Sequence, residues 1–92
     1  MATNDPTHRY AEGTAPEDRR TERAVLAVLL DEHPTRLSLD ELIFALDPKD
    51  FAEKDGIRRA VRELIGAGLV RVDGALIGPT RASIHFNRLE AD

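Results

Sequence analysis

The sequence predicts a small α+β domain in which helices precede a β-hairpin. The most informative stretch is residues 55–78, where an apolar spacing of helical period passes directly into a hairpin signal. Earlier in the chain, Thr14 and Ser38 are each followed three residues later by a Glu, which is the pattern of a helix-capping box. These observations predict three helices, two strands joined by a tight turn, and a short terminal helix.

Length and composition limit the function classes. Ninety-two residues correspond to one domain with a small core, so a function on the surface is expected before an enclosed active site. The absence of Cys excludes a disulfide framework, a thiolate zinc site and a cysteine nucleophile, and it fits a reducing compartment. No apolar run approaches the ~20 residues that span a bilayer, and the first residues lack the apolar region of a secretory signal. We therefore expect a cytoplasmic protein without a membrane segment.

Residues 1–13 are expected to be a disordered tail, and residues 14–92 to form the domain. The tail has no apolar period, so it cannot bury enough surface to offset the entropy of ordering. The first helix is expected to begin at the Thr14 capping box and to end near Glu32, before Pro34. Its first half is charged and its second half is apolar, so we expect the second half to be anchored in the core.

The second helix is expected to begin after Ser38 and to end before Asp47. Its apolar positions share one helical face and are Leu39, Leu42, Ile43 and Leu46. The link that follows, residues 49–54, is charged and contains one large apolar residue, Phe51. We expect Phe51 to close the core between the second and third helices. A single helical turn within this link is an alternative.

The third helix is expected over about residues 54–67. Its apolar stripe recurs with the helical period and consists of Ile57, Ala60, Val61, Leu64, Ile65 and Gly68. Gly66 and Gly68 then supply a stop, because glycine adopts the left-handed conformation of a helix end at little cost. The helix is therefore expected to pass into the hairpin after Gly68.

Residues 69–78 are expected to form the hairpin. The first strand favours an extended conformation, with Val70 and Val72 facing inward. Asp73-Gly74 is the preferred pair for a two-residue type I′ turn. The return strand is expected to end at Gly78-Pro79, because Pro cannot donate a hydrogen bond to the ladder.

Residues 80–89 fit either of two structures. Ala82, Phe86 and Leu89 suit a helix with Thr80 as its N-cap, whereas residues 84–87 alternate with the period of a strand. The short terminal helix is the preferred prediction.

Positive charge is concentrated in the C-terminal part of the chain. The whole sequence has a net charge of −4, which argues against a general polyanion binder. Residues 57–89, however, hold six arginines and two acidic residues, a local net charge of +4. Arg58, Arg59 and Arg62 lie on the third helix opposite its apolar stripe. Arg59 and Glu63 also have the i, i+4 spacing of an ion pair that only supports a helix.

The order of three helices and a hairpin, with the second and third helices joined by a turn, resembles the winged helix-turn-helix family, in particular its small bacterial DNA-binding members. The resemblance covers about residues 14–89, and its most specific phrases are SLDEL at 38–42 and AVRELIGAGLV at 60–70. It implies that the third helix enters the major groove and that the hairpin, as the wing, pairs with a short strand at Arg36-Leu37. The DNA-binding residues that the resemblance implies are Arg58, Arg59, Arg62, Arg71 and Arg81.

DNA binding, with a role in transcription regulation, is therefore the leading hypothesis, and a homodimer or a protein partner is compatible with it. The alternative is a protein-interaction or dimerisation module without DNA binding. Its partner would meet the charged first helix or the acidic surface around Asp50, Glu53 and Asp55, between the second and third helices.

No residue pattern predicts catalysis, a metal site or a bound cofactor. His8, His33 and His85 are far apart and lack the spacing of a zinc site. Ser38 and Ser83 lie outside any nucleophile-elbow pattern, and the sequence has no glycine-rich phosphate loop. We therefore expect neither an enzyme nor a small-molecule ligand.

Overall fold

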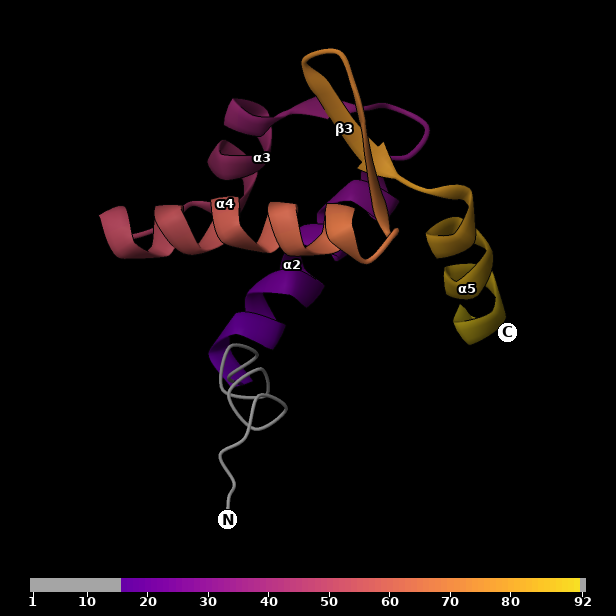
Figure 1. Ribbon diagram of the computed structural model, residues 1–92, viewed down its shortest axis with the longest axis horizontal. Helices are drawn as coiled ribbons and strands as arrows, with labels where there is room; N and C mark the ends of the chain where they lie inside the picture. The colour runs from indigo at the N-terminus through magenta and orange to yellow at the C-terminus, as the bar shows by residue number, and fades with distance from the viewer. Residues whose placement is uncertain (1–15, 92) are drawn as a thin grey trace.

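The computed structural model describes residues 16–91, which form four helices and a three-stranded antiparallel sheet (Figure 1). In chain order the elements are α2 (Pro16–Glu32), β1 (Leu37–Ser38), α3 (Leu39–Leu46), α4 (Phe51–Gly66), β2 (Val70–Asp73), β3 (Leu76–Pro79) and α5 (Arg81–Ala91). The α+β class agrees with the prediction. The expected tail, residues 1–13, and the capping position Thr14 lie outside the described residues.

The core lies where α2 packs against α3, α4 and the sheet. Its buried apolar side chains are Val25, Leu29, Leu42, Ile43, Ile57, Ala60, Val61, Leu64, Val70 and Ile77. Both buried residues of α2 belong to its second half, which confirms that this half anchors the helix. Two members of the stripe expected on the third helix are exposed. Ile65 lies at the edge of the stripe, and Gly68 follows the end of α4.

The start and end of α3 follow its sequence signals. The Ser38 hydroxyl accepts a hydrogen bond from the Glu41 backbone N–H at 3.1 Å, and the Glu41 carboxylate accepts one from the Ser38 N–H at 2.8 Å. The predicted capping box is therefore complete. At the other end, Asp47 has a left-handed backbone with φ of 50°, and its N–H donates to the Ile43 carbonyl at 3.0 Å. The helix ends before Asp47, as predicted.

The start of α4 differs from the prediction. Asp50 is the N-cap, and its carboxylate accepts a hydrogen bond from the Glu53 N–H at 2.9 Å, so the helix begins at Phe51. Residues 51–54 of the expected link are thus helical, as the alternative had it, but they form the first turn of α4. The expectation that Phe51 closes the core is wrong, because this side chain is 74% exposed. At 3.6 residues per turn, Phe51 lies about 120° around the helix from the buried Ile57. The cap that fixes the first turn thus directs Phe51 toward solvent.

The end of α4 is a Schellman motif, which the sequence predicted through its glycines. Gly68 has a left-handed backbone with φ of 81°. The Leu69 N–H donates to the Leu64 carbonyl at 2.9 Å, and the Gly68 N–H donates to the Ile65 carbonyl at 3.1 Å. This pair of hydrogen bonds satisfies the last carbonyls of the helix and turns the chain into β2.

The hairpin forms with a turn shifted by one residue from the predicted one. Asp73 pairs with Leu76, so the two turn residues are Gly74 and Ala75 in place of Asp73-Gly74. Of these two residues only Gly74 has a positive φ, of 65°. A type I′ turn requires a positive φ at both central positions, whereas a type II′ turn requires it only at the first. Gly74 therefore decides the register by occupying the first position.

The sheet has the strand order β1-β3-β2, so the short strand β1 pairs with the hairpin. The predicted strand at 36–37 is observed one residue later, at Leu37–Ser38. Val70 and Ile77 face the core, but Val72 is 53% exposed, contrary to the expectation that it is buried. Val72 is paired with the buried Ile77, but it lies on the edge strand β2, where its outer side has no neighbouring strand.

The terminal helix α5 is confirmed, and its first turn is bonded to the α4–β2 connection. Thr80 is its N-cap and accepts a hydrogen bond from the Ser83 N–H at 3.2 Å. The Thr80 hydroxyl donates to the Gly68 carbonyl at 2.8 Å, and the buried Ser83 hydroxyl donates to the Leu69 carbonyl. These bonds fix α5 at one end of the molecule, whereas α4 begins at the opposite end (Figure 1).

The burial of Leu42 and the exposure of Phe51 predict that truncation to Ala lowers stability at the first position and has little effect at the second. Leu42→Ala should lower the free energy of unfolding by ~2–5 kcal/mol, because it removes a fully buried side chain. Phe51→Ala should change it by no more than ~0.5 kcal/mol, because Phe51 is exposed. Urea unfolding monitored by circular dichroism measures both. A large loss of unfolding free energy in Phe51→Ala would show that this side chain is buried in the core.

The Schellman motif predicts stability changes of opposite sign when Gly68 and Gly66 are each replaced by Ala. Gly68→Ala should destabilise the protein by ~1–2 kcal/mol, since an L side chain is strained in the left-handed region. Gly66→Ala should stabilise it by ~0.4–1 kcal/mol, because Gly66 is helical and an added Cβ meets open space. The same unfolding measurement compares the two. Changes of the same sign in the unfolding free energy of the two variants would contradict the left-handed conformation of Gly68.

Candidate nucleic-acid interface

Four of the five predicted DNA-binding arginines make no ion pair with another residue of the described part of the chain. Arg62, Arg71 and Arg81 are exposed, and Arg58 is partly exposed. Among residues 16–91, none of these four guanidinium groups lies within ion-pair distance of a carboxylate. An unpaired guanidinium keeps its fork of N–H donors available for a phosphate or a base edge.

Arg58 and Arg62 belong to a row of cations along α4. Lys54, Arg58 and Arg62 are successively four residues apart, and side chains at this spacing lie ~5–6 Å apart on one side of a helix. Lys54 likewise makes no ion pair within the described part of the chain. We call these three residues the basic row. The sequence prediction missed Lys54, although the i, i+4 spacing was visible.

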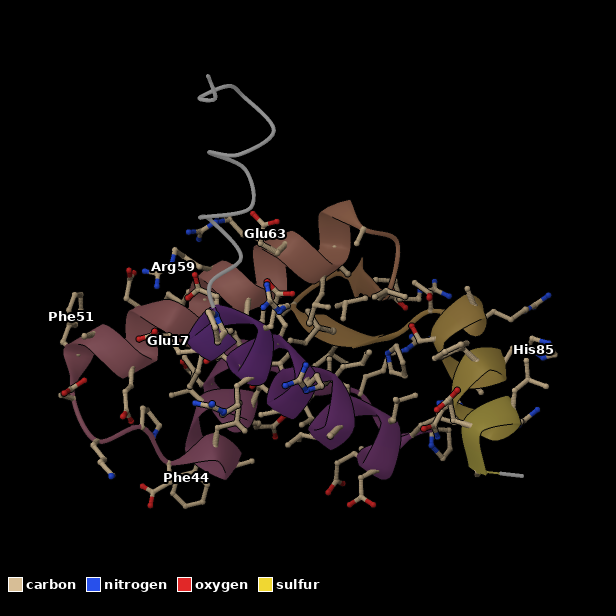
Figure 2. The ribbon with its side chains drawn as sticks, turned by 90° about the horizontal axis from the view of Figure 1, so that it is seen from below. Glu17, Phe44, Phe51, Arg59, Glu63 and His85 are labelled. Carbon is tan, nitrogen blue, oxygen red and sulfur yellow. The ribbon has the colours of Figure 1, made fainter. Side chains whose placement is uncertain are left out.

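Arg59 does not belong to this row. Its Nη1 atom lies 2.7 Å from Asp55 Oδ2, and its Nη2 atom lies 3.8 Å from Asp18 Oδ1. The expected pairing of Arg59 with Glu63 is thus replaced by pairs with Asp55 and with α2. Figure 2 shows Arg59 and Glu63 on the side of α4 that lies near the start of α2. Because its charge is compensated, Arg59 is the weakest candidate of the predicted five.

The acidic residues at the start of α4 have structural partners. Asp50 caps the helix, Glu53 accepts a hydrogen bond from the Lys49 N–H at 2.7 Å, and Asp55 pairs with Arg59. Carboxylates in the first turn are also favoured by the helix dipole. Their presence is therefore explained by the stability of the helix start.

The hairpin carries an acid with an ion-pair partner, Asp73, and an arginine without one among the described residues, Arg71. Asp73 forms an ion pair with Arg36, which precedes β1. The Arg36 side chain passes over Gly78, where an added Cβ would lie 3.2 Å from Arg36 Cγ. Arg71 is paired with Gly78 in the register, so it lies on the same outward face of the sheet. Sequence analysis missed Arg36, because its partner depends on how β1 pairs with the hairpin.

Negative charge gathers between α2 and α4. Burial raises the pKa of the Glu22 carboxyl above its ordinary value, and the nearby carboxylates of Glu63 and Asp18 raise it further, although Arg19 partly offsets them. This acidic cluster adjoins the C-terminal end of the basic row, because Arg62 lines the same small pocket as Glu22 and Glu63.

A groove of about 530 Å³ lies beside this cluster, between the first half of α2, the end of α3 and the first half of α4. Its apolar lining includes Ala24, Leu46, Ala52 and Ile57. Its acidic lining includes Glu17, Asp18, Asp50 and Glu53, whereas its basic residues are Arg20 and Arg59. The groove is thus apolar with an excess of acidic groups. We call it the α2–α4 groove.

Within residues 16–91, no helix combines the length and apolar character needed to cross a membrane. The same residues contain no group of three His, Asp or Glu side chains arranged to hold a metal ion. No protein-family model matches the sequence, and no curated protein or solved structure is significantly similar to it.

The raised pKa of Glu22 predicts a pH-dependent effect on stability. A carboxyl whose pKa is raised on folding contributes stability below its ordinary pKa of 4.5, and this contribution is lost as the pH rises through the folded value. Glu22→Gln should therefore have a higher unfolding midpoint than the wild type at pH 7, and the difference should vanish below about pH 4. Thermal unfolding across this range tests it, with Glu90→Gln on α5 as the control. A difference that persists at low pH would contradict the electrostatic cause.

Proposed function

We propose that the chain is a winged helix-turn-helix protein that binds DNA and acts in transcription regulation. The element order α2-β1-α3-α4-β2-β3, with β1 paired to the hairpin, supports the winged-helix assignment. In this proposal α4 enters the major groove, and the β2–β3 hairpin is the wing. A location in the cytoplasm follows from the same proposal.

The observation that carries the proposal is the unpaired basic row of α4. Affinity for DNA comes largely from phosphates that Lys and Arg neutralise. Arg58 and Arg62, one turn apart and without an ion pair among residues 16–91, are suited to this task, and Arg71 adds a cation on the hairpin that is likewise unpaired within this range. Arg36 compensates Asp73, so the carboxylate near the hairpin tip opposes a phosphate less than an isolated one would.

The proposed contact residues therefore differ from the set that the sequence suggested. Arg58, Arg62 and Arg71 are retained, and Lys54 is added. Arg81 is a peripheral candidate at the start of α5, and Arg59 is left out because Asp55 and Asp18 hold it.

Fluorescence anisotropy of labelled random-sequence duplex DNA tests the proposal at ~50 mM and ~200 mM salt, since counterion release makes phosphate contacts strongly salt-dependent. We expect binding at low salt that collapses at high salt. Arg62→Ala should weaken binding and lower the slope of log K against log salt by about one unit. Arg58→Ala should act in the same direction.

Arg23→Ala is the matched control, because Arg23 is an exposed arginine on α2 outside the proposed surface. It removes the same charge and should lower the slope much less. Absence of binding at both salt concentrations would contradict the proposed function. Equal losses of DNA affinity in Arg23→Ala and Arg62→Ala would show that binding depends only on net charge. This result would reject α4 as the DNA-binding surface.

A further inference from the structure

The helix α5 presents an unpartnered apolar face. Ala82, Phe86 and Leu89 have the i, i+4, i+7 spacing of one helical face, and all three are exposed. Phe86 is 62% exposed and Leu89 is 59% exposed, whereas the side of α5 that faces the protein is anchored by Ser83. Two large apolar side chains at this spacing are typical of a helix that docks in a groove.

The charges beside this face are mainly basic. Arg81 and Arg88 are exposed on α5 and make no ion pair among residues 16–91, and the helix also carries His85 and one acid, Glu90. By helical geometry, Arg81, His85 and Arg88 lie on one flank of the apolar face. The helix α5 is thus an exposed basic amphipathic helix.

The α2–α4 groove has the complementary character. Its lining is apolar at Ala24, Ala52 and Ile57, and it carries more carboxylates than cations. Arg59 is paired with Asp18 and Asp55, so this pair compensates one carboxylate of the groove as well as one arginine, and Glu17, Asp50 and Glu53 remain against Arg20. Its volume of about 530 Å³ falls within the ~300–1,000 Å³ of typical ligand pockets. The groove therefore suits apolar side chains flanked by positive charge.

The helix α5 cannot enter the groove of its own molecule. Thr80 and Ser83 bind its first turn to the carbonyls of Gly68 and Leu69. Along the long axis of the molecule, α5 and His85 lie at one end, whereas Phe51 and the start of α4 lie at the other, and both views agree on this (Figures 1 and 2). A helix from a second molecule has no such restriction.

We propose that α5 of one molecule docks in the α2–α4 groove of a second copy of this chain. Phe86 and Leu89 would insert against the apolar lining, and Arg81 and Arg88 would approach the acidic residues of the groove. The contact is heterologous, because it joins two different surfaces. The assembly is a closed dimer if each of two molecules places its α5 in the groove of the other. It is an open linear oligomer if they do not pair in this reciprocal way. It does not depend on DNA binding.

The area of one short helix in a groove is at the small end of specific interfaces, so the association should be weak. Because charges of opposite sign flank the contact, it should also weaken as the salt concentration rises. These two properties set the conditions of the test, which are high protein concentration and low salt, without DNA.

Sedimentation velocity from about 10 μM to about 500 μM protein covers the dissociation constants expected of a weak contact. The wild type should associate as its concentration rises. Phe86→Asp should remain monomeric because it places a carboxylate in an acidic groove. Ala52→Arg should also remain monomeric, because it places a bulky cation in that groove. Phe44→Asp is the matched control, since Phe44 is 87% exposed on α3 and does not line the groove; it should associate like the wild type.

A mixture of the two defective variants gives the decisive result. Phe86→Asp keeps an intact groove and Ala52→Arg keeps an intact α5, so the mixture should form a species of two molecules that neither variant forms alone. A monomeric wild type at every concentration would overturn the proposal. A loss in Phe86→Asp that Ala52→Arg does not share would also overturn it, because that result points to pairing of α5 with α5. So would a mixture that stays monomeric, because an intact α5 and an intact groove would then be present without binding each other. Circular dichroism confirms that each exposed-site variant is folded.

Discussion

Burial of the apolar stripe of α4 against α2 is the interaction that positions both the basic row and the α2–α4 groove. Ile57, Ala60, Val61 and Leu64 share one core cluster with Val25 and Leu29 of α2. Once this stripe is buried, the rotation of α4 about its axis is fixed. One flank then presents the basic row to solvent, and the other flank brings Arg59 to Asp18. Packing of apolar side chains therefore decides which cations are available for a ligand.

The turn at Gly68 positions the elements that follow α4 in the chain. Its left-handed backbone ends α4 and aims β2 at the core through Val70, and the carbonyls of Gly68 and Leu69 then receive Thr80 and Ser83. A single helix end thus sets the position of the hairpin and of α5. Since α5 is held by hydrogen bonds at its first turn and not by its apolar face, that face stays exposed.

The arrangement separates charge in a chain whose net charge is negative. Cations without an ion pair among residues 16–91 include Arg58 and Arg62 on α4, Arg71 on the hairpin and Arg81 on α5, whereas several carboxylates gather between α2 and α4 or serve as caps. Separation of this kind allows a protein with a net charge of −4 to offer a phosphate a locally positive surface. It also gives one molecule two faces of opposite charge, which suit contact between copies.

Sequence alone determined the features that depend on neighbouring residues. The Ser38 capping box, the buried part of the apolar stripe of α4, the stop at Gly68 and the N-cap at Thr80 are local patterns, and each was found where it was predicted. Only the tertiary structure decided the exposure of Phe51, the pairing of Arg59 with Asp18 and the pairing of Arg36 with Asp73. Local hydrogen bonds and helical periodicity act within a few residues, so the sequence contains them directly. Burial and ion pairing join residues that are distant in the chain, and they are settled only when the helices and the sheet pack together.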